Sequence, residues 1–535
     1  MISGATDNIL LSIVAHARSG ALDRADRLFF EGGLDKVKDD PAVLSVKGRL
    51  LKDHALAASV RKRKSLYREA AEAYEQAAKI SGTSYPLINA ATLSLLAGQR
   101  RRAGTFARRI LSRAGTEETE TLYWRAATLA EAQLLLGRTS EAKASLRTAI
   151  ALAVRSYEDH ASTLRQFGLI LDELGADKTW LDEFRPPRSL HFAGHMALSP
   201  TRNAVERVIR KTIEQERIGF GYGALAAGAD ILVAEALLEA GAELHLVLPA
   251  TTAVFRDMSV ASLGADWATR FDAIIKRASN IRVIKNDADP ISALEIKLAA
   301  EIAMGNAVMQ AEILMTEAVQ LVITDRTSGK RFAESATGAN ALVWRQSARR
   351  QYILTAPRVR RRALPATQKR PEKEERLAAF LRIDLSGTSA TILLERILPR
   401  LAEIFAATRP QFVPPRWTGE ALIAVFQSAA DAAEISLLVA RALKGHEGFR
   451  IAAHFGIARL ADDPFSAQQF VVGPAALMPA RILLSTPAGA VHASEDFAAV
   501  LCAGPANKRP RVEYIGDLPS ENSGSRPVRL FSLKP

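Results

Sequence analysis

Residues 220–249 read FGYGALAAGADILVAEALLEAGAELHLVLP and contain an apolar run, a glycine-containing loop, a helical segment and a second apolar run, in that order. The runs FGYG and ELHLVLP have the length of strands, and the segment between them is rich in Ala, Leu and Glu. A strand, a crossover helix and a second strand form the repeating unit of a parallel sheet. This stretch therefore predicts an α/β domain with a doubly wound sheet.

Further apolar runs extend this pattern on both sides of the opening stretch. They occupy residues 189–194, 217–223, 243–249, 280–285, 320–325 and 351–356. Long segments rich in Ala, Leu and Glu separate several of them, as expected for helices that cover both faces of a parallel sheet. We expect this domain to span residues 188–356. The adjacent prolines in EFRPPRSL (183–190) mark its start because they cannot continue a helix.

The loop of the opening stretch has the residue types of a phosphate site. Gly223 and Gly228 allow the backbone to approach a ligand, and amide groups at the start of the following helix favour an anion. Asp230 would cap that helix or accept a hydrogen bond from a ribose hydroxyl. Gly194 ends the first strand, and ligands bind beyond the C-terminal ends of such strands. The alternative is that these residues form only a tight turn and a cap.

The same residues resemble the SLOG superfamily of Rossmann-like proteins, which includes DprA and the LOG enzymes. Its sensor members carry loops of the type G-x-A-x-G-A-D-x-x-A, and the loop here is one residue longer. The resemblance implies a domain that senses a nucleotide or a nucleotide-derived ligand. The implied nucleotide-binding residues are Gly194, Gly223, Ala224, Gly228 and Asp230. The G-x-G-x-x-G spacing of dinucleotide oxidoreductases is absent.

Residues 1–182 carry helical signals and few strand signals. Three stretches, SGALDRADRLF, AGQRRRAGTFA and LGRTSEAKASL, align on a glycine followed five residues later by an alanine. The aligned pairs are Gly20 with Ala25, Gly98 with Ala103, and Gly137 with Ala142. A glycine in the turn and an alanine at the helix crossing suit stacked helix pairs. The pattern resembles tetratricopeptide-type repeats, which have a shorter period, and implies a solenoid that binds a protein partner and no small ligand.

Residues 357–376 are charged, contain three prolines and have no periodicity, so we expect an exposed linker there. Residues 377–535 then alternate strand-like and helix-like segments, which predicts an α+β domain. Asp384 closes the apolar run FLRID, and Glu420 precedes the apolar run ALIAVF. Two such carboxylates on neighbouring strands can hold Mg²⁺ together with phosphate oxygens. Carboxylates at strand ends also occur as caps and exposed turn residues, so this pair alone does not decide the function.

The order of segments in this domain resembles class III adenylate/guanylate cyclases. The segments are RIDLSGTS, WTGEALIAVF, FRIAAHFGIA and VVGPAALMPARILLSTPAGAVHAS. The resemblance implies a ferredoxin-like cyclase fold that works as a homodimer with shared sites, and ATP or GTP bound with Mg²⁺ or Mn²⁺. Asp384 and Glu420 match the two metal-binding positions, the second of which is normally Asp. Arg416 stands at the base-selecting position, and Arg481 matches the arginine that stabilises the triphosphate in the transition state.

Other positions depart from the cyclase pattern. Leu477 replaces the asparagine that orients the ribose, Phe470 stands near the second base-reading position, and the tail 514–533 lacks the phosphate-binding lysine. Loss of one such donor costs roughly 10²- to 10³-fold in rate. We therefore expect a signalling protein with a catalytically weak or degenerate cyclase-like output domain, and the resemblance to purine nucleotide cyclases does not by itself make the chain an enzyme. The alternatives are an active cyclase with a variant site, or a protein-interaction scaffold without catalysis.

Composition limits the remaining functional classes. The formal net charge is +13, but the basic runs at 61–64, 100–102 and 358–362 form no single recognition motif, so we do not expect nucleic-acid binding. The one cysteine, Cys502, excludes an internal disulfide framework and fits a cytoplasmic protein. No uninterrupted apolar run reaches the length of about 18 residues that a membrane span needs.

Overall fold

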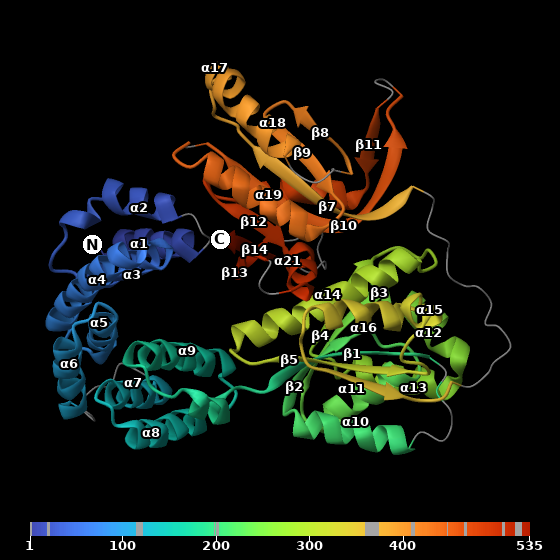
Figure 1. Cartoon of the computed structure of the whole chain (residues 1–535), viewed down its shortest axis with the longest axis horizontal. Helices are drawn as coiled ribbons and strands as arrows, with labels where there is room; N and C mark the ends of the chain where they lie inside the picture. The colour runs from blue at the N-terminus through green and yellow to red at the C-terminus, as the bar shows by residue number, and fades with distance from the viewer. Residues whose placement is uncertain are drawn as a thin grey trace. The chain divides into compact units, whose positions relative to one another are not determined.

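The computed structural model describes residues 3–18, 22–113, 121–196, 198, 203–358, 374–407, 412–446, 448–464, 468–505, 509–518 and 527–534. The chain forms two compact units, shown in Figure 1 and treated separately below. Unit 1 contains residues 1–186 together with 313–315, and unit 2 contains residues 187–312 and 316–535. The predicted boundary at 183–190 thus coincides with the passage from one unit to the other.

Unit 1 is built from helices that stack on their neighbours along the chain (Figure 1). The helices are α1 (Ser3–Arg18), α2 (Leu22–Glu31), α3 (Pro41–Ala57), α4 (Val60–Ser81), α5 (Ser84–Leu96), α6 (Arg100–Ser112), α7 (Leu122–Leu135), α8 (Thr139–Leu152) and α9 (Tyr157–Leu174). Short 3₁₀ turns follow at Leu34–Lys36 and Thr179–Phe184. The helical N-terminal region predicted from the sequence is therefore confirmed.

The glycine and alanine pattern falls on the turns and crossings that it predicts. Gly98, between α5 and α6, has a φ of +82°, and Gly137, between α7 and α8, has a φ of +75°. Both angles lie in the left-handed region that glycine adopts without strain. Ala103 and Ala142 each lie in the first turns of the second helix and are buried. These small side chains allow the paired helices to pack closely.

Gly20 and Gly98 lie 78 residues apart, twice the 39 residues between Gly98 and Gly137, and the longer interval has a structural explanation. The turn between α3 and α4 contains Ser59, which lies 39 residues before Gly98. A helix pair thus occupies the expected place, but its turn lacks the glycine that marks the others. Gly20, which opened the pattern, lies outside the described residues. The repeat is therefore more regular in the structure than in the glycine spacing.

Unit 1 contains an enclosed carboxyl group where three helices meet. Thr92 on α5 donates a hydrogen bond of 2.6 Å to Glu131 on α7, and Gln166 on α9 donates one of 3.3 Å to the same oxygen. Burial raises the pKa of Glu131 to about 7, against the opposing effect of the hydrogen bonds and of Lys52 on α3. Burial also lowers the pKa of Lys52. Glu131 therefore exchanges its proton near neutral pH.

We expect this group to make unit 1 less stable as the pH rises. The folded pKa of about 7 exceeds the reference value of 4.5, so the folded state binds more protons between those values. Stability therefore falls by about 2 to 3 kcal/mol across this window. Glu131→Gln should remove that loss. Hydrogen exchange of α7 at pH 5 and pH 8 measures it, with Glu141→Gln on the exposed face of α8 as control. Equal pH dependence in both variants would contradict the prediction.

The first part of unit 2 is a six-stranded parallel sheet of order β4-β3-β2-β1-β5-β6. Its strands are β1 (Arg188–Gly194), β2 (Ile218–Gly223), β3 (Glu243–Ala250), β4 (Asn280–Lys285), β5 (Ala318–Thr324) and β6 (Gln351–Thr355). All six predicted strands are present, and the parallel sheet is confirmed. The chain order reverses between β1 and β5, where ligands of open α/β sheets bind.

Helices cover both faces of this sheet (Figure 1). They are α10 (Asn203–Gln215), α11 (Ala229–Glu239), α12 (Thr252–Ser259), α13 (Ala265–Ile275), α14 (Ala293–Ile313), α15 (Lys330–Ala333) and α16 (Ala336–Gln346). Leu321 and Ile323 of β5 pack in one core cluster with α10 and α11. Val322 between them packs in another cluster with Ala341 of α16. This alternation is what a sheet with two apolar faces requires.

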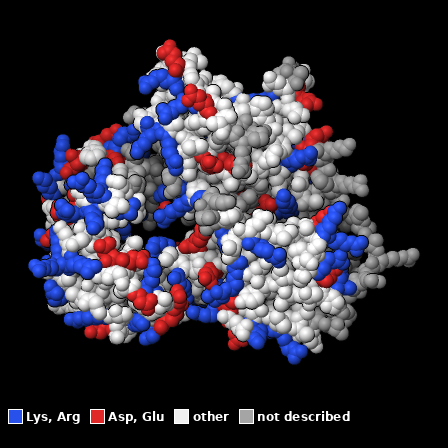
Figure 2. Space-filling model, in the orientation of Figure 1, with Lys and Arg blue, Asp and Glu red and all other residues white. Residues whose placement is uncertain are grey.

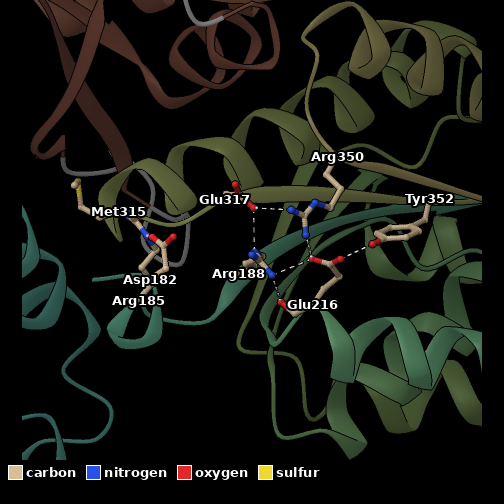
Figure 3. A network of polar contacts seen from close by, with 8 residues as sticks. All are labelled: Asp182, Arg185, Arg188, Glu216, Met315, Glu317, Arg350 and Tyr352. Atoms are coloured by element: carbon tan, nitrogen blue, oxygen red, sulfur yellow. Dashed lines mark hydrogen bonds and ion pairs between the residues drawn. The ribbon is translucent and has the colours of Figure 1, made fainter. Parts of the chain in front are cut away.

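A charged network lies at the N-terminal ends of the sheet strands (Figure 3). Buried Glu216 pairs with Arg188 at 3.0 Å and with Arg350 at 2.7 Å, and it accepts a hydrogen bond from the Tyr352 hydroxyl. Glu317 pairs with the same two arginines at 3.2 and 3.5 Å. Because two cations surround Glu216, its burial is compensated. The network joins the starts of β1, β5 and β6. A ligand would bind at the opposite, C-terminal ends of the strands.

The second part of unit 2 is an α+β domain with a mixed sheet of order β13-β14-β12-β10-β7-β9-β8, and β11 pairs with β10. Its strands are β7 (Glu375–Asp384), β8 (Val413–Thr418), β9 (Ala421–Phe426), β10 (Arg450–Asp462), β11 (Gln469–Val472), β12 (Val491–Ser494), β13 (Arg511–Leu518) and β14 (Val528–Lys534). Its helices are α17 (Ala390–Ile392), α18 (Leu398–Ala406), α19 (Ala429–Ala442), α20 (Pro474–Leu483) and α21 (Glu495–Ala503). The domain begins at β7, two residues before the predicted 377, and most of the predicted linker lies outside the described residues.

Surface charge bears on the expectation about nucleic-acid binding, and the length and composition of the helices bear on the expectation about membrane spans. On the face that Figure 2 shows, Lys and Arg side chains of each unit are interspersed with Asp and Glu side chains. None of the helices in the described ranges is both long and apolar enough to cross a membrane.

Candidate functional site

The two predicted metal carboxylates stand at one end of the second sheet. Asp384 is the last residue of β7 and pairs in register with Ala421, the first residue of β9. Glu420 lies in the exposed turn between β8 and β9, after Gly419 with a φ of +62°. The Leu385 amide donates a 2.9 Å hydrogen bond to the Glu420 carbonyl. The backbones that carry Asp384 and Glu420 are thus directly adjacent.

The Asp384 carboxylate already has partners on its own turn and on the next strand. Ser386 donates to it through the backbone N–H at 3.3 Å and through the hydroxyl at 3.0 Å. Arg450, the first residue of β10, places Nε 3.7 Å from Oδ2 of Asp384. The Asp384 side chain is only 16% exposed. This arrangement fixes the carboxylate and gives it a neighbouring positive charge, which a bound cation would have to share or displace.

Arg416 and Phe470, which the sequence predicts at or near the base-reading positions of the cyclase pattern, lie close together. Arg416 lies on β8, and its guanidinium carbon is 6.0 Å from the centre of the Phe470 ring on β11. Arg416 also donates to the backbone carbonyl of Gln469 at 3.0 Å and to the side chain of Gln468 at 3.3 Å. A guanidinium over an aromatic face is a planar surface that suits stacking.

Arg481 and Leu477 lie on another element, α20, which packs on β10 and β7. They are four residues apart and therefore share one face of the helix. Leu477 is 68% exposed, and Arg481 is partly buried. An exposed leucine beside an arginine leaves an apolar surface where the cyclase pattern has a hydrogen-bonding side chain.

The donor set near Asp384 is compatible with Mg²⁺ or Mn²⁺ bound together with phosphate. Asp384 and Glu420 carry carboxylate oxygens, the ligand type that these ions prefer, on adjacent stretches of backbone. No group of three or more His, Cys, Asp or Glu side chains that could hold a metal is found among the residues that the structure describes. A metal at this site would therefore need oxygens from a nucleotide or from water to complete its shell, as Mg²⁺ commonly does.

In the first sheet, the two loops predicted to bind a nucleotide converge. Gly194 ends β1 and Gly223 ends the neighbouring strand β2. The Ala229 amide at the start of α11 donates to the His195 carbonyl at 3.3 Å. Gly228 before it has a φ of +102°, which favours glycine.

Two of these glycines are needed for packing. A Cβ at Gly194 would lie 2.2 Å from the Cβ of Ala229, and a Cβ at Gly223 would lie 2.7 Å from Phe192. Protein atoms therefore occupy the space beside both glycines. Ala224, between them and the helix, is partly buried and packs on the same apolar core. For Gly194 and Gly223 the geometry favours the purely structural alternative.

Asp230 lies inside the convergence of these loops. Its Oδ2 accepts a hydrogen bond of 3.2 Å from the Ala226 amide within the loop, and the residue is 6% exposed. Burial raises the pKa of Asp230 to about 7, while the backbone N–H groups of Ala226 and Gly194 oppose that rise. Its Oδ1 is buried and has no hydrogen-bond partner within the described part of the chain. An unsatisfied acceptor of this kind is costly unless a further donor reaches it.

The packing at Gly194 leads to a stability prediction. We expect Gly194→Ala to lower the free energy of unfolding by about 1 to 3 kcal/mol, because the added methyl group overlaps Ala229. Gly168→Ala, in helix α9 where no atom lies within 4 Å, should instead be neutral or stabilising by up to about 1 kcal/mol. Denaturant unfolding of the two variants measures both effects. Unchanged stability of Gly194→Ala would show that the loop has room to relax.

Two residues that contact Asp384 were not assigned a role from the sequence. Arg450 lies within the quoted segment FRIAAHFGIA, and Ser386 lies within RIDLSGTS. Their contacts with Asp384 depend on strand register and on a turn, neither of which the segment order reveals. The presence of an arginine at the start of a predicted strand was the available signal.

Several solved structures and one protein family are similar to parts of the chain. The adenylyl cyclase CyaB from P. aeruginosa matches 30% of this chain and 96% of its own, with 14% identity and a TM-score of 0.26. The guanylate cyclase domain of RhGC from Catenaria anguillulae, solved with GTP, matches 30% and 97%, with 17% identity and a TM-score of 0.25. No curated protein matches the sequence. Residues 8–94 match the family Tetratricopeptide Repeats-Sensor, in agreement with the predicted repeats in that part of unit 1.

Proposed function

We propose that this chain is a cytoplasmic signalling protein with a class III nucleotidyl cyclase-like output domain. In this proposal the domain binds ATP or GTP with Mg²⁺ or Mn²⁺ and turns over slowly or not at all. The observation that carries the proposal is the adjacency of Asp384 and Glu420, joined by the 2.9 Å hydrogen bond from the Leu385 amide to the Glu420 carbonyl. Two carboxylates at one sheet end suit a cation that also binds a triphosphate.

Each residue of the proposed site has a definite task. Asp384 and Glu420 would hold the cation, which supplies positive charge to the triphosphate. Arg416, backed by the Phe470 ring, would lie along the purine base and donate to its edge. Arg481 would act across a homodimer, because the cyclase pattern divides each site between two subunits. Arg450 would balance the charge of Asp384 when no cation is bound.

The same residues support slow turnover. Leu477 cannot orient a ribose by hydrogen bonding, and its side chain is 68% exposed. The longer arm of Glu420 adds a methylene, and misplacement by about 1 Å can cost about 10²-fold in such a site. Nucleotide binding is less sensitive to these losses than the chemical step. The domain would then act mainly as a nucleotide-responsive switch or dimerisation module.

The other domains would regulate this output. The sheet domain is proposed to bind a nucleotide-derived ligand, for which Oδ1 of Asp230 offers a buried acceptor at the start of α11. The close packing of Gly194 and Gly223 reduces the role of these two residues to shaping the loop. The helical repeats are proposed to bind a protein. A scaffold without nucleotide binding remains the competing function.

One experiment separates the three functions. Purified protein is titrated with ATP and GTP in the presence of Mg²⁺ or Mn²⁺, and cyclic nucleotide is then sought by mass spectrometry. Metal-dependent binding with little cyclic product is expected. Rapid formation of cyclic AMP or cyclic GMP would establish the active-cyclase alternative. Substituting the candidate residues of each domain in turn shows which domain binds the nucleotide. If the wild type binds no nucleotide, the scaffold function is supported.

A further inference from the structure

Within unit 2, an arginine from the parallel sheet forms ion pairs with the first turn of α21. Arg282 on the edge strand β4 forms ion pairs with both Glu495 and Asp496. The side chains are 19%, 4% and 15% exposed, so solvent screens these charges little. Arg529 of β14 lies 3.6 Å from the second oxygen of Glu495. Acidic residues at the start of a helix also suit the helix dipole.

The other end of α21 is held by a second arginine of the sheet domain. Arg349, which precedes β6, donates hydrogen bonds to the carbonyls of Cys502, Ala503 and Gly504 at 3.0 to 3.1 Å. The last carbonyls of a helix lack partners within the helix, and a cation there satisfies them. Side chains of the parallel-sheet domain thus stabilise both ends of α21.

Between its ends, α21 lies directly against α14. A Cβ at Gly305 of α14 would lie 1.8 Å from the backbone oxygen of Ala499. Only glycine permits this approach of the two helix backbones. Farther along α14, Glu312 pairs with Arg509, whose side chain is 7% exposed. The contact thus combines close backbone packing with an ion pair whose arginine is largely buried.

Helix α21 connects directly to the strands of the second sheet. Ser494 ends β12 and caps α21 by accepting from the Phe497 amide at 3.3 Å. The Ser494 hydroxyl also lies 2.8 Å from Nδ1 of His454 on β10. The same strand begins at Arg450, which neighbours Asp384. A displacement of α21 therefore has a short route to the strand beside the candidate metal site.

We propose that Arg282, Arg349 and Gly305 form a coupling interface through which the parallel-sheet domain controls the position of α21. The interface joins the two domains independently of the segment 359–373 that links them in the chain. Movement of β4 or α14 is passed to β12 and β10 through the cap at Ser494. The inference concerns how the domains are joined and holds whether or not the C-terminal domain turns over a nucleotide.

The test cuts the linking segment and asks whether the halves stay together. A protease site is inserted between residues 359 and 373 of the full-length protein, which is then cut under native conditions. We expect the cut wild type to elute as one species in gel filtration. Arg282→Met should weaken the association of the halves by at least about 30-fold, because it leaves two buried carboxylates short of a counter-charge. Asp496→Asn should weaken the association to a smaller degree.

Arg277→Met is the matched control, since Arg277 is exposed in the same domain and lies outside the interface. Hydrogen exchange of β1 to β3 must be unchanged in Arg282→Met, which shows that its sheet domain is folded. Exchange in α21, β12 and β10 of the uncut variant should accelerate. Separation of the cut wild type would overturn the proposal, as would Arg282→Met behaving like Arg277→Met. Weakened association with unchanged exchange in β12 and β10 would remove the coupling route.

Discussion

Asp384→Asn is expected to weaken metal-dependent triphosphate binding by about 100-fold, equivalent to about 2.7 kcal/mol. The substitution keeps the size of the side chain but removes the charge that a divalent cation needs. It also leaves Arg450, now 3.7 Å from a neutral group, to repel the incoming cation. Calorimetric titration with a non-hydrolysable ATP or GTP analogue, with and without Mg²⁺, measures the effect.

The control is Glu434→Gln on the exposed face of α19, away from the residues of the proposed site. That variant should bind the analogue as the wild type does. Retained affinity in Asp384→Asn would remove Asp384 from the metal site and leave it as the partner of Arg450 and Ser386. Loss of affinity only in the presence of metal is the signature that distinguishes a ligand from a residue that supports the fold.

The sequence predicts all strands of the first sheet but only the inner strands of the second. In the first sheet the inner strands β1, β2, β3 and β5 are largely buried apolar runs, and the partly buried edge strands β4 and β6 were predicted as well. In the second sheet, β8, β11 and β13 were not predicted. Strand β8 contains Pro414 and Pro415, which argue against a strand but are tolerated at a sheet edge. Strand β13 is the opposite edge and carries mixed polar residues.

The candidate sites show the same division between local and tertiary information. The adjacency of Asp384 and Glu420 follows from their positions at strand ends, which the sequence reveals. The packing roles of Gly194 and Gly223 do not, because the atoms that fill their space belong to Ala229 and Phe192. The ion pair between Arg282 and Glu495 joins residues 213 positions apart, and no local pattern marks it.

Leu477→Asn is expected to raise the rate of cyclic nucleotide formation by about 10²-fold over the wild type. An asparagine restores a hydrogen-bonding group where the cyclase pattern orients the ribose, and one such group contributes roughly 10² to 10³ in rate. The substitution should not disturb the fold, because Leu477 is 68% exposed and its neighbour on the same helix face, Arg481, remains. Mass spectrometry of the product formed from ATP or GTP with Mn²⁺ measures the gain.

Leu484→Asn tests whether the gain requires this position, since Leu484 follows α20 and is 84% exposed. It should leave the rate unchanged. Adding Asp384→Asn to Leu477→Asn should abolish the gain, because ribose orientation is useful only when the triphosphate is bound. If Leu477→Asn binds the analogue normally and forms no more product than the wild type, ribose orientation is not the limiting loss. The missing tail lysine and the longer arm of Glu420 would then limit the chemistry.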